Sequence, residues 1–323
     1  MSHACKILQA SAENIDLCAD LLRDEAVVGV PTETVYGLAG NALKEVSLRK
    51  IFEVKGRPML DPLIVHFSSI EQAEIHAEFN EHARALAAQF WPGALTLVLP
   101  KKDTISDLVT AALPSVAVRV PEHLIFRSLL EQLDFPLAVP SANPFGYVSP
   151  TLAEHVASTL GDRILAVIDG GACKHGVEST IVDLRDPDSP KILRPGPLSA
   201  DQLGMRGAEV EQSSNELAQV APGMLTQHYS PNTPITLFGH HEQPSNVQKL
   251  EAVLYNTKPA GGLTKNTYWL SESGDLTEIA HNLFMLIQKL DARDYTQLRV
   301  ERAEHVDIGI AVNDRLSRAA AKR

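Results

Sequence analysis

Short apolar runs alternate with helix-like segments from residue 27 to about residue 194. The runs are rich in β-branched side chains, as is typical of buried strands. They are VVGV (27–30), LIVHF (63–67), LTLVLP (95–100), VAVRVP (116–121), LAVPSAN (137–143), AVIDG (166–170), STIVDL (179–184) and KILRP (191–195). Helical periodicity occurs near 45–53, 71–90 and 124–132. The alternation predicts an α/β domain built on one mixed, mostly buried sheet, whose strand order the pattern leaves open.

The pattern breaks at residues 204–233, which are polar, contain several Gly and Pro residues and show no clear period. Beyond this segment lie PITLF (234–238), a helix near 245–254, a helical stretch near 276–290, LRVER (298–302) and the amphipathic segment IGIAVNDRLSRAA (308–320). These elements predict a second, smaller α/β domain. We therefore divide the chain into a first domain at 1–203, a linker at 204–233 and a C-terminal domain at 234–323.

The composition is that of a globular protein and argues against several other classes. A chain of 323 residues, 44% of them hydrophobic, can bury more than one core. No run approaches the roughly 20 apolar residues of a membrane span and the first residues lack a signal-peptide core, so we expect a cytoplasmic protein. The three cysteines form no C-x-x-C pair, which argues against a disulfide framework and a zinc site. The net charge of −11 opposes a broad nucleic-acid-binding surface.

Two polar segments are candidates for ligand binding, and the first lies where α/β sheets bind their ligands, beyond the end of a strand. The segment PTETVYGL (31–38) follows VVGV directly, and its Thr32 and Thr34 can hydrogen-bond a substrate or cap a turn. The segment FEVKGRP (52–58) ends a helical pattern with Lys55 and Arg57. These two cations fit a polyphosphate clamp or a basic helix C-terminus about equally well.

A nucleotide would have to be bound without a P-loop, since the chain has no G-x-x-x-x-G-K-[ST] match. Arg194 in LRPG (193–196) is a third candidate cation for that purpose, or a surface charge. The loop PSANPFGYVSP carries Ser141, Asn143 and Ser149 between prolines, directly after an apolar strand. Such loops suit phosphate or ribose recognition, and we interpret this one as functional.

Polar residues also interrupt the apolar strands. Arg119 in VAVRVP requires an anion if it is buried, which is either a structural carboxylate or the carboxylate of an amino-acid substrate. His66 in LIVHF is a core histidine or a substrate ligand. In GVESTIVD, Ser179 is a further candidate ligand and Glu178 a metal or amine contact, unless the segment is a strand with polar outward positions.

Read in order, these segments resemble the YrdC-type threonylcarbamoyl-AMP synthase family. The resemblance covers roughly residues 10–205 and rests on PTETVYGL, KGRP, DPLIVH, AVRVP, SANPFGYVSPT, GVESTIVD and LRPG. PGMLTQHYSP (222–231) and IGIAVNDRLSRAA resemble the linker and the last helix of the longer, two-domain members. The resemblance implies a YrdC-like twisted mixed sheet with helices, followed by a smaller Rossmann-like α/β domain.

The activity that the resemblance implies is nucleotidyl transfer. L-threonine, bicarbonate and ATP, accompanied by Mg²⁺, would give threonylcarbamoyl-AMP and pyrophosphate. The product would serve the modification of an adenosine in tRNA, and a separate tRNA threonylcarbamoyl transferase complex would consume it. The chain itself is expected to bind tRNA weakly or not at all and to have no membrane partner. In the longer members the linker folds over the active site, so residues 204–233 are expected to form a lid.

The resemblance also assigns roles to individual residues. The family pattern K-x-R followed by S-x-N gives the catalytic residues Lys55, Arg57, Ser141 and Asn143. The expected ATP-binding residues are Lys55, Arg57, Met59, Ser115, Ser141, Ser149, Arg194 and Tyr229. The expected threonine-binding residues are Arg119 for the carboxylate, with Thr34, His66 and Ser179 around the amine and side chain. No protein-bound metal is expected, because ATP would carry the Mg²⁺.

The sequence departs from the family pattern at three positions. Asp61 stands where Asn is usual, Phe145 replaces a small residue, and Val177 stands where Leu is common. Asp61 and Phe145 affect the expected nucleotide contacts rather than the reaction class. Two other functions stay open: an RNA-binding module, and a carbamoyltransferase like the hydrogenase-maturation protein that contains a related domain. That larger protein has zinc-binding C-x-x-C pairs and an acylphosphatase-like segment, which this sequence does not show.

Overall fold

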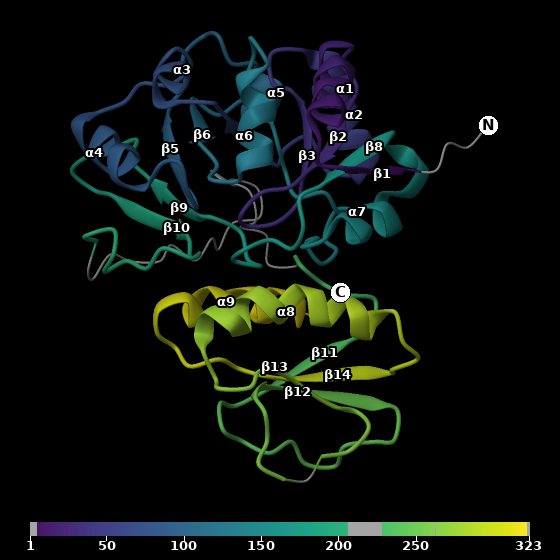
Figure 1. Ribbon diagram of the computed structural model, residues 1–323. Coiled ribbons are helices and arrows are strands. Elements are labelled where there is room, and N and C mark those ends of the chain that lie inside the picture. The colour runs from purple at the N-terminus through teal and green to yellow at the C-terminus, as the bar shows by residue number, and fades with distance from the viewer. Residues whose placement is uncertain (1–4, 206–227, 262, 322–323) are drawn as a thin grey trace.

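Two separate sheets, each with its own helices, make up the molecule (Figure 1). The computed structural model describes residues 5–205, 228–261 and 263–321. The first sheet ends at Arg194 and the second begins at Ile235. Most of the predicted linker, residues 206–227, lies outside the described residues. The predicted fold class, an α/β protein with a twisted mixed sheet and a second, smaller α/β unit, is confirmed.

The larger sheet has ten strands in the order β1-β8-β2-β3-β7-β4-β6-β5-β9-β10. They are β1 (Lys6–Gln9), β2 (Val28–Val30), β3 (Gly37–Asn41), β4 (Ile64–His66), β5 (Leu95–Pro100), β6 (Ser115–Arg119), β7 (Leu137–Ala138), β8 (Ala166–Asp169), β9 (Thr180–Asp183) and β10 (Lys191–Arg194). At its centre β4 runs parallel to β6, which places His66 opposite Arg119, and antiparallel to β7. Every strand predicted from an apolar run in this domain is present.

The helices of this domain connect and cover the strands. They are α1 (Ala12–Arg23), α2 (Glu45–Lys55), α3 (Ile70–Glu74), α4 (Glu81–Phe90), α5 (Asp107–Thr110), α6 (Leu124–Glu131), α7 (Ala153–Leu160) and the 3₁₀ helix η1 (Gly161–Arg163). Local signals set their ends: Ser11 and Asn80 accept backbone N–H groups at the starts of α1 and α4. Helix α2 ends at Gly56, whose φ of 63° lies in the left-handed region that glycine adopts readily. Lys55 and Arg57 therefore flank a tight turn.

The smaller sheet consists of β11 (Ile235–Phe238), β12 (Glu251–Thr257), β13 (Thr267–Ser271) and β14 (Gln297–Glu301). All its pairs are parallel, and the order is β11-β14-β12-β13. Helices α8 (Leu276–Asp291) and α9 (Asp307–Ala319) lie between this sheet and the larger domain (Figure 1). A parallel sheet with helical crossovers is the Rossmann-like arrangement that the resemblance implies.

One predicted element is wrong. The sequence suggested a helix near 245–254, but the described chain forms turns up to Leu250 and then strand β12. The run EAVLYNT lies in the sheet interior between β13 and β14, where both of its faces are largely buried. A central parallel strand reads as a continuous apolar run, which periodicity does not separate from a buried helix.

Apolar side chains join the two units. Val35, Val148 and Val177 from the larger domain belong to the same buried cluster as Leu283 and Phe284 of α8. Gln288 of α8 donates to the carbonyl oxygen of Ser149 at 2.9 Å. Helix α8 therefore buries apolar surface against the larger domain as well as within its own unit. None of the described helices is long and apolar enough to cross a membrane.

Candidate active site

A small polar cavity lies where the central strands of the larger sheet end and the C-terminal unit approaches. Its volume is about 50 Å³. Its walls come from the turn after β2, the ends of β4 and β6, the loop after β7, the start of β9 and the end of β10. The lining residues are Thr32, Thr34, Val35, Gly37, Arg57, Ile64, His66, Arg119, Val139, Pro140, Ser141, Glu178, Ser179, Arg194, His228 and Tyr229.

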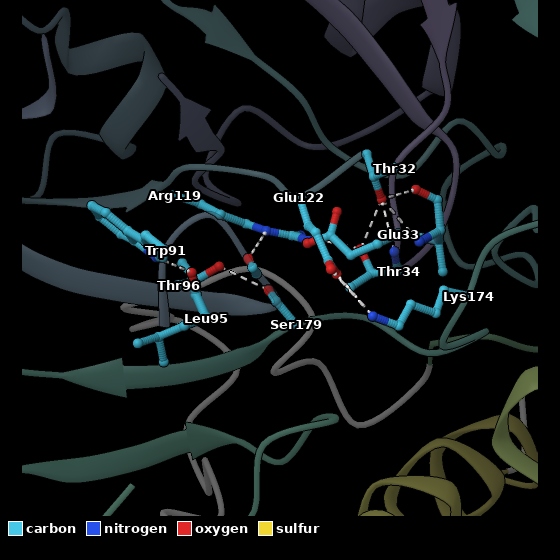
Figure 2. Close-up of polar contacts among 12 residues, drawn as sticks. Thr32, Glu33, Thr34, Trp91, Leu95, Thr96, Arg119, Glu122, Lys174 and Ser179 are labelled. Carbon is cyan, nitrogen blue, oxygen red and sulfur yellow. Dashed lines mark hydrogen bonds and ion pairs between the residues drawn. The ribbon is translucent and has the colours of Figure 1, made fainter. Parts of the chain in front are cut away.

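Arg119 is held on one side of the cavity by three acceptors (Figure 2). Its guanidinium forms an ion pair with Glu33, donates to Oγ1 of Thr34 at 3.1 Å and donates through Nε to the carbonyl oxygen of Gly93. Arg119 and Glu33 are both buried. The structural carboxylate that the sequence left open is therefore Glu33. These bonds use three of the five N–H groups of an arginine, so its cavity-facing side still has donors for a ligand.

The two threonines of the turn PTET differ in role: one caps the turn, and the other faces the cavity, where a substrate would bind. Oγ1 of Thr32 accepts the N–H groups of Thr34 and Val35, both at 3.1 Å, so Thr32 caps the turn. Thr34 instead presents its hydroxyl to Arg119 and lines the cavity. Oε2 of Glu33, between them, is buried and has no hydrogen-bond partner in the described part of the chain. A ligand that donates hydrogen bonds would satisfy it.

His66 carries an unpaired nitrogen in the cavity wall. Its ring packs against Phe126 with centroids 5.7 Å apart, and its buried Nδ1 atom has no hydrogen-bond partner within residues 5–205, 228–261 and 263–321. Burial, reinforced by the charge of Arg119 on the neighbouring strand, holds the pKa of His66 well below its usual value. The imidazole is therefore neutral at physiological pH and can accept or donate one hydrogen bond on either nitrogen.

Ser179 connects the strands on the opposite wall. Its hydroxyl lies 2.7 Å from Oγ1 of Thr96, and Arg194 donates to its Oγ and to its carbonyl oxygen, both at 3.1 Å. Arg194 is buried, and burial lowers the pKa of its guanidinium from the usual value. The buried location favours the ligand-binding reading of Arg194 over a surface charge.

Lys55 joins the K-x-R turn to the S-x-N loop directly. Its ammonium group donates to the carbonyl oxygens of Ser141 and Asn143 at 2.6 and 2.5 Å. Burial, together with the charge of Arg57, keeps the pKa of Lys55 well below its usual value. The side chain of Asn143 bonds to the carbonyl oxygens of Pro144 and Tyr147 within its own loop. Lys55 thus fixes the backbone of the loop that presents Ser141 to the cavity.

Arg57 is paired with Asp61, one of the departures from the family pattern. The two side chains are buried, with Nη2 of Arg57 lying 2.9 Å from Oδ1 of Asp61. Arg57 also donates to the carbonyl oxygen of Pro62. Burial raises the pKa of Asp61 despite the opposing charges of Arg57 and Lys55. An asparagine at this position would leave Arg57 without its carboxylate partner.

The C-terminal unit reaches the cavity through Arg315 of α9. Its side chain is fully buried and donates to Oε2 of Glu178 at 2.7 Å, while Ser149 donates to the other oxygen of Glu178. Burial alone would raise the pKa of Glu178, but the charges of Arg315 and Arg194 lower it below its usual value. Glu178 is therefore an ionised wall residue whose charge is already matched.

His228 and Tyr229 close the cavity from the linker side. The centroid of the Tyr229 ring lies 5.3 Å from the guanidinium of Arg315, and the ring stacks on Phe284. Its buried hydroxyl has no hydrogen-bond partner among the residues that the structure describes. Phe145 meets the ring of His228 edge-on at 6.1 Å, which gives this departure from the family pattern a packing role. Burial lowers the pKa of His228 to about 3. Both rings are uncharged and cover a cavity that is lined by polar side chains.

Two protein-family models together match nearly the whole chain. Residues 20–196 match the Sua5–YciO–YrdC family, described as "Telomere recombination", and residues 195–321 match the family "Threonylcarbamoyl-AMP synthase, C-terminal domain". The chain belongs to the Sua5–YciO–YrdC family. The resemblance drawn from the motifs is thereby confirmed.

Several relatives of this family match along nearly their whole length. The threonylcarbamoyl-AMP synthase of Pyrococcus abyssi is 39% identical over 326 residues, which covers 96% of this chain and 94% of the relative. The enzyme of the same name from Bacillus subtilis is 36% identical over 98% of this chain and 95% of its own. The crystal structure of P. abyssi Sua5 complexed with L-threonine superposes with a TM-score of 0.89 at 36% identity, covering 98% of this chain and 97% of that one.

The Sua5-type fold brings most of the expected site residues together. The cavity is lined by all four expected threonine ligands and by four of the expected nucleotide ligands: Thr34, His66, Arg119, Ser179, Arg57, Ser141, Arg194 and Tyr229. Lys55, Asn143 and Ser149 are buried one layer behind its wall. Met59 and Ser115 do not line it: Met59 is 49% exposed, and Ser115 is buried at the opposite end of β6 from Arg119.

The sequence analysis missed three residues that shape this Sua5-type cavity. Glu33 lies inside PTETVYGL, and the need of Arg119 for an anion was a signal that pointed to it. His228 lies beside the expected Tyr229, but a lone histidine in a linker carries no signal of its own. Arg315 belongs to another domain, so only the folded chain shows its contact with Glu178.

Proposed function

We propose that the chain is a threonylcarbamoyl-AMP synthase, which converts L-threonine, bicarbonate and ATP into threonylcarbamoyl-AMP and pyrophosphate. The observation that carries the proposal is the full-length similarity to a relative whose structure contains L-threonine, combined with a cavity lined by the four expected threonine ligands. The product is an activated acyl donor, suited to a transferase that modifies adenosine in tRNA.

The reaction has two steps whose atoms balance. The amine of threonine attacks bicarbonate to give a carbamate and water. A carbamate oxygen then attacks the α-phosphorus of ATP, and the bond to the bridging oxygen breaks to release pyrophosphate. Neither step requires a protein nucleophile. A site made of positioned donors and buried cations suits such chemistry, since its main demands are alignment of the reactants and neutralisation of the phosphates.

Threonine would bind on the side of Arg119. The guanidinium would take the carboxylate, while Oε2 of Glu33, which lacks a partner, is suited to a threonine ammonium group before it loses its proton. The neutral imidazole of His66 and the hydroxyls of Thr34 and Ser179 would hold the amine and the side-chain hydroxyl. A pocket with this many paired donors and acceptors would disfavour valine, because its methyl group would leave buried polar groups unsatisfied.

ATP would enter as its Mg²⁺ complex on the side of Arg57 and Arg194. Both guanidinium groups line the cavity and can form forked bonds with phosphate oxygens. Ser141 presents its polar atoms from the loop that Lys55 holds. The Mg²⁺ ion would remain on the phosphates and neutralise the leaving pyrophosphate, so we assign it no ligands from the protein.

Nucleotide binding would require His228 and Tyr229 to move. A volume of about 50 Å³ is far below the roughly 300–1,000 Å³ of pockets that hold small molecules. Closure over bound substrates would exclude water, which protects both the carbamate and the mixed anhydride from hydrolysis. This agrees with the lid role expected of the linker, whose residues 206–227 lie outside the described structure.

The test is pyrophosphate release from MgATP by the full chain, with threonine and bicarbonate omitted in turn. We expect release only when both are present, and we expect valine not to replace threonine. Release that needs neither substrate would indicate an ATP pyrophosphohydrolase and contradict the proposal. Salt-sensitive RNA binding without release in any mixture would favour the RNA-binding alternative.

A further inference from the structure

The C-terminal unit carries a cluster of metal-binding residues that the proposed reaction does not use. His240 and His241 follow β11, and Glu301 is the last residue of β14. The two strands are parallel neighbours, with Phe238 in register with Glu301. All three residues therefore lie at the carboxyl edge of a parallel sheet, the edge at which α/β folds bind ligands.

The three side chains already converge. One ligand atom from each residue lies within 4.8 Å of the corresponding atoms of the other two. Nδ1 of His240 is 3.4 Å from Oε1 of Glu301, and this buried atom has no hydrogen-bond partner among the described residues. Ligand atoms around a tetrahedral metal ion, each at about 2.0–2.2 Å from it, are roughly 3.3 Å apart. Small side-chain rotations would bring the cluster to that geometry.

Glu301 is a buried carboxylate that lacks a strong cation. Its side chain is only 5% exposed, and among the described residues no lysine or arginine forms an ion pair with it. Its two oxygens instead accept the backbone N–H groups of His241 and Asn256 at 2.7 and 2.8 Å. These bonds hold the carboxylate in place, as outer bonds do for a metal ligand, and they leave lone pairs for a cation.

The backbone of His241 is strained in a way that keeps the cluster together. Its φ of 61° lies in the left-handed region, which is unfavourable for a residue with a Cβ atom. The two imidazole rings lie close together, with centroids 3.7 Å apart and planes tilted by 33°. The short distance between the rings brings one nitrogen of each within reach of a single metal ion.

We propose that His240, His241 and Glu301 form a zinc site that the proposed synthase reaction does not require. Two imidazole nitrogens and one carboxylate oxygen are a ligand set that Zn²⁺ accepts, and three protein ligands leave a fourth position for water or a small ligand. His240 also lines a cavity of about 540 Å³ with Leu193 and Pro195, the neighbours of Arg194. The fourth position would therefore face space between the two units.

The zinc ion would connect three parts of the C-terminal unit. It would tie the segment that follows β11 to the end of β14 and, through Glu301, to the backbone of Asn256 in β12. We expect zinc to raise the thermal unfolding temperature of the full chain, because it binds the folded arrangement and not the separated residues. We expect pyrophosphate release to be retained without it.

The test is zinc binding by full-length, tag-free protein that has been stripped with a chelator. Titration calorimetry with zinc chloride should give one ion per chain, with a rise in unfolding temperature. The double variant His240→Asn, His241→Asn should bind zinc at least about 100-fold more weakly, since even outer-shell changes cost about 10–100-fold. The matched control His82→Asn, in helix α4 of the other domain, should bind as the wild type does.

Cobalt provides a second measurement that does not depend on stability. Co²⁺ bound in place of zinc should give the visible absorption bands of a four- or five-coordinate ion, absent from the double variant and present in His82→Asn. Glu301→Gln should also lose the bands; if that variant does not fold, the histidine variant alone decides. Absence of stoichiometric zinc binding in the wild type, or equal affinity in the double variant, would overturn the proposal.

Discussion

Arg315 of the last helix forms a buried ion pair with Glu178 in the wall of the cavity, at 2.7 Å. The same guanidinium covers the ring of Tyr229 and donates to the carbonyl oxygen of Pro195, the residue after Arg194. One side chain of the C-terminal unit thus contacts three segments of the candidate active site. This gives the second domain a direct part in shaping that site.

Replacing Arg315 by Met should therefore destabilise the whole chain. Removal of one partner of a buried pair leaves Glu178 without its direct ion-pair partner, and breaking such a pair costs about 3–5 kcal/mol of unfolding free energy. Denaturant unfolding measures this loss, and Arg302→Met, at an exposed residue of the same unit, should cost less than about 1 kcal/mol. At a temperature where all three variants are folded, Arg315→Lys should release pyrophosphate faster than Arg315→Met, because lysine keeps a positive charge near Glu178. Equal stability of the two Met variants would contradict the role of the pair.

Lys55→Met should abolish most pyrophosphate release. The change removes the donor to the carbonyl oxygens of Ser141 and Asn143 and leaves both without this bond. We expect kcat/KM for ATP to fall at least about 100-fold, corresponding to about 2.7 kcal/mol of transition-state stabilisation. Lys50→Met is the control, since Lys50 lies on the same helix and donates to the backbone carbonyl oxygen of Glu25, away from the loop that carries Ser141. A smaller loss in Lys55→Met than in Lys50→Met would refute this assignment.

Arg119→Ala should raise the KM for threonine by far more than the KM for ATP. The guanidinium is placed to take the threonine carboxylate, and its charge-assisted hydrogen bonds are each worth about 1.5–3 kcal/mol, or roughly 10–150-fold in affinity. Initial-rate kinetics with each substrate varied separately measure the two constants. Arg127→Ala, on the exposed side of α6, serves as the control. Equal increases in both constants would remove Arg119 from the threonine site.

Asp61→Asn should lower the KM for ATP. The carboxylate of Asp61 lies beside Arg57 and competes with phosphate for the same guanidinium. Asparagine has nearly the same volume and no charge, so the guanidinium would become available to the nucleotide. A gain of about 1 kcal/mol in ground-state binding corresponds to roughly fivefold in KM. Since burial raises the pKa of Asp61, the difference between the variants should shrink as the pH falls. An unchanged or higher KM would show that Asp61 assists ATP binding.

His228 should make the folded state less stable in mild acid. Its pKa in the folded chain is about 3, whereas an exposed histidine has a pKa near 6.5, so below pH 6.5 the unfolded chain takes up a proton that the folded chain does not. The contribution of His228 to the free energy of unfolding is therefore complete above about pH 6.5 and is lost as the pH falls towards about 3. Between pH 7.5 and pH 5 the free energy of unfolding should fall by about 2 kcal/mol on account of this one histidine.

Denaturant unfolding at these two pH values measures the effect. His228→Gln should make the dependence of the unfolding free energy on pH shallower by about that amount. His82→Gln, at a half-buried histidine of helix α4, is the matched control. His66, whose pKa is also depressed by burial, should act in the same direction. The same slope in His228→Gln as in the wild type would contradict a buried, neutral His228.

The larger domain was predictable from sequence because its strands are short apolar runs with clear boundaries. Strand β3 (Gly37–Asn41) escaped notice because GLAGN has no β-branched residue; its place between β2 and β7, rather than local propensity, makes it a strand. The strand β12 was mistaken for a helix for the related reason that its burial on both faces hides the alternation that marks a strand.

The candidate site was predictable as a set of segments but not as a set of contacts. The motifs identified Lys55 and Ser141, yet only the fold shows that Lys55 binds the loop backbone rather than facing the cavity. The sequence required an anion for Arg119 without specifying Glu33. The departures at Asp61 and Phe145 became interpretable only through their partners, Arg57 and His228.

The order of strands in the larger sheet has a consequence for how quickly the protein can become active. Strand β1 pairs with β8, and β5 pairs with β9, so residues far apart in the chain must meet before these parts of the sheet exist. Parallel pairings between distant segments form slowly, because the entropy of closing long loops is lost before contacts compensate for it. The cavity draws its walls from β4, β6, β9 and β10 together. Activity should therefore return only at the end of refolding, after most helical signal has recovered.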